Sequence, residues 1–201
     1  DLTETLAAAH GSLESYPLGE SIPIGEWVVE SGARAGNRIP EKLVGVSNNG
    51  GLVPFKGSSA KDTSRYRELR PMRVNVGSIA LCRREEEAGW VSPDYVVFRL
   101  VDGAPFDEEF LLMYLKSEQG KAEIVRESRG AVRRRLYFDG VQKINVPVPG
   151  NRDSWTSLIS SFAALRRYLR ELPVMAMGTL AALETAIFSS RQVSNEAPSQ
   201  R

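Results

Sequence analysis

The sequence holds a single cysteine, Cys82, and a single histidine, His10, in 201 residues. One cysteine cannot form a disulfide within the chain, so we expect a reducing, cytoplasmic setting. One histidine near a weakly patterned start disfavours a Ser–His or Cys–His catalytic pair, and no Cys/His spacing matches a zinc site. No apolar run reaches the roughly 20 residues that cross a bilayer, and the N-terminus lacks a charged-then-apolar signal pattern, so we expect no membrane partner.

Other motifs of catalysis are also incomplete. The glycine-rich run 45–57 lacks the Gly-Lys-Ser/Thr ending of a phosphate loop, and no Gly-x-Gly-x-x-Gly follows a strand. Ser92-Pro93-Asp94-Tyr95 is similar to the Ser-Pro-Pro-Tyr motif of amino-methyltransferases, but its second proline is replaced and no glycine-rich cofactor loop precedes it. Pro93-Asp94 could begin a metal-dependent nuclease motif, yet no Glu-x-Lys or Asp-x-Lys partner follows at a strand spacing. We expect a turn here, and a chain without catalytic residues, metal or cofactor.

The net charge of +1 hides blocks of opposite sign. Residues 1–30 hold six acids and no Lys or Arg, and residues 85–110 hold eight acids and one base. Residues 31–84 hold eleven bases and three acids, and residues 111–150 have a net charge of +4. Such blocks indicate faces of opposite sign, of which the basic ones suit a polyanion. The alternative is that solvated charges cluster by chance.

The apolar pattern predicts an α+β fold, in which a compact mixed α/β domain over residues 1–150 precedes a long helix. Alternation and β-branched residues predict strands at 27–29, 43–46, 52–55 and 95–101, with a turn at 47–51. Residues 72–82 predict one strand with a bulge at Gly77, and residues 136–148 a further strand. Residues 107–126 predict a helix capped by Asp107 and interrupted at Gly120, and a short helix is expected within residues 1–20.

Residues 151–190 have a heptad-like spacing of apolar residues, which predicts a helical spacer with one apolar seam. Pro173 and Gly178 interrupt it, so we expect a kinked helix or a helical pair, followed by a disordered tail at 191–201. The seam could be an interface with a partner or a second copy. Its residues are Trp155, Leu158, Phe162, Leu165, Leu169, Leu172, Leu180, Leu183 and Ile187.

Lys and Arg in the basic blocks can neutralise phosphates, and Ser, Thr, Asn and Arg can also bond to base edges. Three consecutive arginines, 133–135, follow a Ser-Arg-Gly turn and cannot all lie on one face of a strand. A DNA-binding role is therefore predicted, against the alternative of ordinary solvated loops. The candidate contacts are Arg34, Arg38, Asn48, Asn49, Lys56, Lys61, Ser64, Arg65, Tyr66, Arg129, Arg133, Arg134, Arg135 and Lys143.

The sequence resembles a known family, the specificity subunits of type I restriction–modification systems. The resemblance covers about residues 40–190 and rests on the order and spacing of motifs that are loose one by one. These are GVSNNG at 45–50, KDTSRY at 61–66, GWVSPDYVVF at 89–98, FLLMYLKS at 110–117, SRG at 128–130, LYF at 136–138 and INVPVP at 144–149, followed by a long helix.

The resemblance implies a target-recognition domain that binds the major groove of double-stranded DNA and a trailing helix that docks methyltransferase subunits. Asn48, Lys61, Ser64 to Tyr66 and Arg129 to Arg135 then become DNA contacts, and activity resides in partner methyltransferase and restriction subunits. Ser92 to Tyr95 becomes a structural turn.

The chain departs from the family pattern in three respects. It has one recognition domain and one spacer where complete members have two of each, it lacks the usual Gln after the proline-rich strand, and its helix is interrupted at Pro173. A half-length subunit that forms a homodimer and an excised fragment of a longer protein both remain open, and the start at Asp1 fits a processed product or a fragment. The alternatives in function are a methyltransferase- or nuclease-associated enzyme domain and a helical protein-interaction module.

Overall fold

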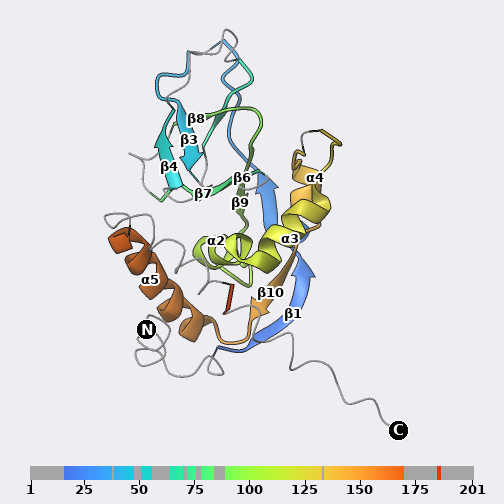
Figure 1. The fold of residues 1–201 in the computed structure, drawn as a ribbon, viewed down its shortest axis with the longest axis vertical. Coiled ribbons are helices and arrows are strands. Elements are labelled where there is room, and N and C mark those ends of the chain that lie inside the picture. The colour runs from blue at the N-terminus through green and yellow to red at the C-terminus, as the bar shows by residue number, and fades with distance from the viewer. Residues whose placement is uncertain are drawn as a thin grey trace.

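The computed structural model describes residues 16–37, 39–47, 51–55, 64–69, 72–75, 78–83, 89–132, 134–169 and 185–186. Helices and strands are mixed along these ranges, which confirms the α+β expectation (Figure 1). The elements are β1 (Leu18–Pro23), η2 (Ile24–Trp27), β2 (Val28–Glu30), β3 (Val44–Ser47), β4 (Gly51–Pro54), β5 (Arg67–Glu68), β6 (Met72–Asn75), β7 (Ser78–Leu81), β8 (Trp90–Val91), β9 (Val96–Leu100), α2 (Glu108–Lys116), α3 (Glu118–Glu127), α4 (Phe138–Val141), β10 (Asn145–Pro149) and α5 (Arg152–Leu169).

An antiparallel sheet in the order β2-β9-β6-β7 lies at the centre of the described structure. Strand β9 has buried side chains on both of its faces. Val96, Phe98 and Leu100 belong to the core that contains α2, whereas Val97 belongs to a second, smaller cluster. Because successive side chains of a strand point to opposite faces, β9 separates two apolar cores.

The second cluster lies inside a small group of strands, which we call the β lobe and which consists of the hairpin β3–β4 and the pair β5–β8. Its buried residues are Val44, Leu69, Val91 and Val97. The hairpin pairs Val44 with Pro54 and Ser47 with Gly51, which confirms the two predicted strands and the reversal between them. Figure 1 shows the β lobe above the sheet, on the side away from β1 and β10.

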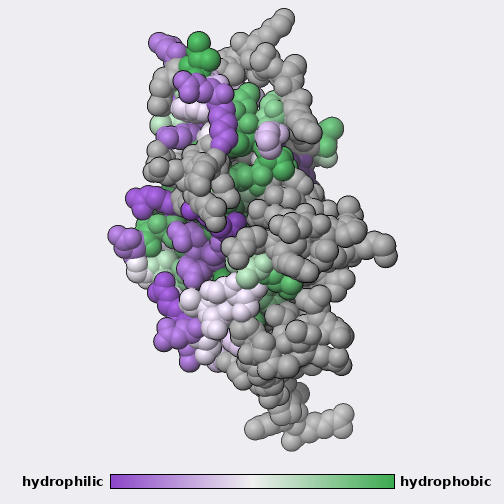
Figure 2. All heavy atoms as spheres, turned by 90° about the vertical axis from the view of Figure 1, so that its left-hand side faces the viewer, coloured by the Kyte–Doolittle hydropathy of each residue, from purple (hydrophilic) through white to green (hydrophobic). Residues whose placement is uncertain are grey.

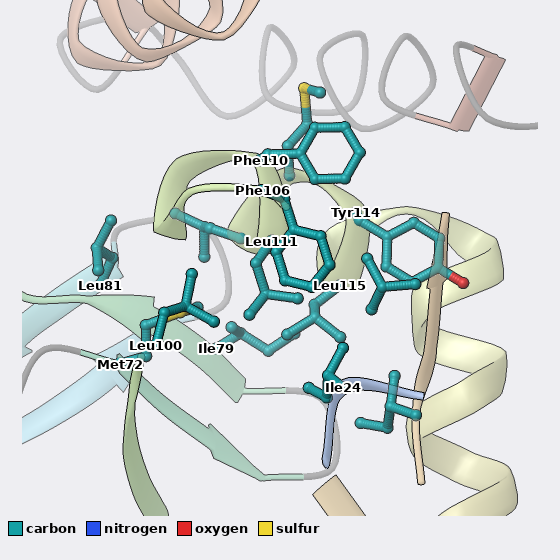
Figure 3. Close-up of a cluster of buried hydrophobic side chains, with 14 of the residues drawn as sticks. Ile24, Met72, Ile79, Leu81, Leu100, Phe106, Phe110, Leu111, Tyr114 and Leu115 are labelled. Atoms are coloured by element: carbon teal, nitrogen blue, oxygen red, sulfur yellow. The ribbon is translucent and has the colours of Figure 1, made fainter. Parts of the chain in front are cut away.

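Helix α2 covers the other face of the sheet and supplies most of the main core. Six consecutive residues, Phe110 to Leu115, are buried. Figure 3 shows several of them facing Met72, Ile79 and Leu100 of the sheet. The helix begins as predicted, because the Asp107 carboxylate accepts a hydrogen bond from the Phe110 N–H at 2.8 Å.

The predicted interruption of the helix at Gly120 is corrected by the structure. The break lies at Ser117, which is buried and whose hydroxyl donates to the Tyr114 carbonyl at 2.6 Å and accepts from the Gly120 N–H at 3.2 Å. Ser117 thus ends α2 and caps α3 at the same time. Gly120 lies inside α3 and is buried against the end of α2.

Helix α5 packs against α2 and completes the main core. Trp155, Leu158, Ile159 and Phe162 are buried there, and Leu165 packs at its edge. Within residues 152–165, the exposed side chains of α5 are polar or small. Figure 2, which faces this side, shows hydrophilic and neutral side chains mixed with hydrophobic ones. The described part of α5 therefore belongs to the globular body, and whether residues 151–190 also form a spacer stays a prediction.

Two expectations about strands were wrong, and one strand was missed. Strands β6 and β7 pair antiparallel, with Asn75 opposite Ser78, so residues 72–81 form a hairpin in place of one bulged strand. Residues 136–148 contain the short helix α4 before β10, so they are not a single strand. Strand β1 was missed: it pairs with β10, for example Ser21 with Pro147, across more than half of the chain.

Because Tyr114 is buried, the stability of the protein should decrease at alkaline pH. Burial raises the pKa of its hydroxyl, the nearby Glu123 carboxylate raises it further, and Arg126 lowers it. As pH rises past about 10, the unfolded chain loses this proton while the folded chain keeps it. The contribution of Tyr114 to the free energy of unfolding should therefore be constant below that pH and fall above it. Urea unfolding of Tyr114→Phe against pH should show a shallower alkaline decline, with a residual slope from Tyr16, whose pKa burial also raises. An unchanged slope would contradict the assignment.

Candidate nucleic-acid interface

Residues 129–135 form a closed loop, which we call the arginine loop, between α3 and α4. Its two ends form an antiparallel bridge in which the Arg129 N–H donates to the Arg135 carbonyl at 2.9 Å and the Arg135 N–H donates to the Arg129 carbonyl at 2.8 Å. Gly130 has a φ of 116°, a conformation that side chains other than glycine disfavour, and it turns the chain outward. Leu136 follows and is buried in the main core. The base of the loop is thus fixed to the body, and Figure 1 shows the loop at the upper right beside α4.

Each described arginine of the loop has a partner from a different element. Arg129 forms an ion pair with Asp139 of α4, and Arg135 pairs with Asp94 at 2.9 Å. Arg134 donates to the Val125 carbonyl at the end of α3 at 3.0 Å. All three side chains are exposed, so these contacts orient the guanidinium groups without burying them.

Acidic residues reduce the net charge around the loop. Arg126 pairs with both Glu127 and Glu123, and the hydrogen bond that it donates to Glu127 is the largest cause of its raised pKa. Exposed ion pairs of this kind contribute only about 0–1 kcal/mol each to stability. A phosphate could therefore take the place of Asp94 or Asp139 at little energetic cost, and each guanidinium has more N–H donors than these contacts use.

Apolar side chains lie among the arginines and were missed by the sequence interpretation. Val132 is fully exposed, Tyr137 is 50% exposed at the start of α4, and Val125 is 42% exposed at the end of α3. Nothing in the local pattern distinguishes them from buried residues, because Val and Tyr are common in cores. The exposure of Val132 follows from its place in the exposed part of the loop.

A second basic segment lies along the β lobe. Residues 34–36 pair with 64–67: Arg34 forms a bridge with Arg67, the Ala35 N–H donates to the Tyr66 carbonyl at 2.8 Å, and the Gly36 N–H donates to the Ser64 carbonyl at 2.9 Å. Arg34 and Arg65 are exposed and Ser64 is half-buried. Arg67 points instead to Glu30, with which it pairs at 2.9 Å.

A short turn, residues 92–95, connects these two regions. The Ser92 hydroxyl accepts from the Asp94 N–H at 3.3 Å, and the Ser92 carbonyl accepts from the Tyr95 N–H at 3.1 Å. This confirms the predicted turn into the strand that follows. The turn carries Asp94, the partner of Arg135, and it follows β8, which pairs with β5 at Arg67. The turn therefore links the arginine loop, through β8 and β5, to the second basic segment.

The remaining predicted DNA contacts are distributed as follows. Tyr66 is 7% exposed, so the expectation that its ring meets DNA is corrected: its side chain is buried, and its carbonyl fixes residue 35. Lys143 is exposed in the turn between α4 and β10. Arg38, Asn48, Asn49, Lys56, Lys61 and Arg133 lie outside the described residues.

The predicted interface seam is also corrected in part. Trp155, Leu158 and Phe162 are buried within this chain, so they face its own core and offer no surface to a partner. Leu165 packs against the same core. Leu169 ends α5, with a side chain outside the description, and Leu172, Leu180, Leu183 and Ile187 lie outside the described residues.

The described part of the chain was also compared with the requirements of a thiol site, a metal site and a membrane-spanning helix. Cys82 is half-buried beside the β-lobe cluster, and no group of three or more His, Cys, Asp and Glu residues is arranged there to hold a metal ion. Within the described ranges, no helix has the length and apolar character that crossing a membrane requires.

Comparison of the sequence with protein-family models gives no match, and comparison with curated proteins gives none either.

Proposed function

We propose that this chain is a recognition subunit for double-stranded DNA, which reads a sequence and directs partner methyltransferase and restriction subunits to it without catalytic residues or a cofactor of its own. The observation that carries the proposal is the arginine loop, with its fixed base and exposed guanidinium groups. The single cysteine and the family resemblance support a cytoplasmic setting and these partners.

Charge and geometry favour DNA over a protein as the ligand of this loop. Arginine binds phosphate through two parallel N–H groups and guanine through the O6 and N7 atoms, and both modes need an exposed guanidinium held in one orientation. Arg129 and Arg135 meet this requirement through Asp139 and Asp94. Arg34 and Arg65 on the β lobe would extend the contact along the backbone of the duplex.

The interaction-module alternative has less support. It depends on an apolar seam that is open to a partner, whereas Trp155, Leu158 and Phe162 of that seam are buried in this chain. A homodimer or a docking helix would have to use the outer face of α5 or residues beyond it.

Removal of two loop arginines should weaken DNA binding at every sequence. Arg134→Ala with Arg135→Ala removes two candidate phosphate contacts. The slope of log affinity against log salt concentration should therefore become shallower by about 2. Fluorescence anisotropy with a labelled duplex, measured over a range of salt concentrations, gives this slope directly.

Lys121→Ala with Arg152→Ala is the matched control, because both side chains are exposed and lie outside the loop. This variant loses the same formal charge, so a general electrostatic effect would lower its affinity equally. DNA binding that is undetectable or independent of salt, in the unmodified chain, would overturn the proposal. Equal losses in the two double variants would remove the loop from the interface.

A further inference from the structure

An apolar side chain stands at the outer part of the arginine loop. Val132 is fully exposed, and its neighbours Gly130 and Ala131 are exposed as well. A single exposed apolar residue is ordinary on a protein surface. Here, however, it lies on a loop closed by two backbone hydrogen bonds and flanked by oriented arginines. A ligand that carries an apolar group between negatively charged groups could contact both the valine and the arginines.

The width of the loop selects one groove of DNA. Its two ends form a hydrogen-bonded antiparallel pair, whose Cα atoms are typically about 5.5 Å apart. The major groove of B-form DNA is about 12 Å wide, so it has room for a loop with this base and its side chains, whereas the minor groove is only about 6 Å wide. The major groove is also where each base pair presents a distinct pattern.

We infer that Val132 of the arginine loop contacts the C5 methyl group of a thymine in the major groove. This inference rests on the proposed function and deepens it, since it assigns one base contact to one side chain. The C5 methyl group is the apolar feature of the major groove, and the flanking arginines remain for phosphates or for guanine.

A pair of methyl deletions, one on the protein and one on the DNA, tests the contact. A pool of random-sequence duplexes is first selected on the full chain, and the enriched duplex is then made with single thymine-to-uracil changes, each of which removes one C5 methyl group. At one position the unmodified chain should lose affinity by about fourfold, the expected value for one buried methyl group. Val132→Ala should show almost no loss at that position, because the partner of the methyl group is already gone.

Cytosine and 5-methylcytosine in place of that thymine provide the reverse test, because only the second restores a methyl group. Ile39→Ala, at an exposed apolar residue outside the arginine loop, is the matched control and should respond to uracil as the unmodified chain does. If an enriched duplex is found and uracil affects Val132→Ala and the unmodified chain equally at every position, the Val132 contact is refuted while DNA recognition stands. If no duplex is bound, both proposals fail.

Discussion

Trp155→Ala should destabilise the isolated chain by about 3–5 kcal/mol, the usual cost of removing a large aromatic side chain from a core. Trp155 is 1% exposed, and its ring meets Phe110 edge-on at 5.1 Å and Tyr16 at 5.7 Å. Its indole N–H donates to the Pro17 carbonyl at 3.1 Å. The substitution therefore leaves a cavity between α2 and α5 and an acceptor that loses its donor. Urea unfolding followed by circular dichroism measures the loss.

Ser157→Ala is the matched control, because Ser157 is exposed on the same helix. Its effect should lie within about 0.5 kcal/mol. Trp155→Phe should fall between the two, since it keeps an aromatic ring but gives up volume and the hydrogen bond to Pro17. A Trp155→Ala chain as stable as the unmodified one would show that this side chain is not part of the core, and would restore it as a candidate interface residue.

The burial of Trp155 inside its own domain also explains why part of the seam was wrongly predicted to be an interface. A heptad-like spacing shows that a helix has one apolar face, but it does not show what covers that face. The same spacing serves a helix that packs on a partner and one that packs on its own domain. Trp155 is covered by Phe110 and Tyr16, which are 45 or more residues away in the sequence. No local pattern carries that information.

Features set by neighbouring residues were predicted correctly. The Asp107 cap, the strand at β9 and the reversal between β3 and β4 each depend on a few adjacent side chains. The turn at Ser92 is also local, because both of its hydrogen bonds join residues that are two or three apart.

Features set by distant contacts were not predicted. Strand β1 reads as an ordinary polar segment, Leu-Gly-Glu-Ser-Ile-Pro, and becomes a strand because β10 pairs with it. Composition singles out the arginines of the loop as candidates, but it does not identify their partners. Asp94 lies 41 residues before Arg135, so the contact that orients this guanidinium follows from the fold alone.

Gly120→Ala should destabilise the chain by about 2 kcal/mol or more, although alanine is the better helix former. A Cβ at this position would lie 2.2 Å from the Tyr114 carbonyl oxygen and 2.6 Å from the Leu115 Cα atom. Both are backbone atoms of α2, so no side-chain rotation can relieve the overlap. The two helices would have to separate at Ser117, whose hydrogen bonds to Tyr114 and Gly120 fix their junction. Thermal and urea unfolding report the loss.

Two controls separate this close approach from helix propensity. Ala122 is exposed on the same helix, so Ala122→Gly should cost about 1 kcal/mol through propensity alone. Gly45 lies in β3 with its nearest neighbour, Val53 Cγ2, at an ordinary 3.6 Å, so Gly45→Ala should be neutral or slightly stabilising. If Gly120→Ala stabilised the chain, the close approach of the two helices at this glycine would be refuted. If Gly120→Ala destabilises the chain and both controls behave as expected, Gly120 is a contact point between α2 and α3. In the sequence, the only sign of this contact is that the residue has no side chain.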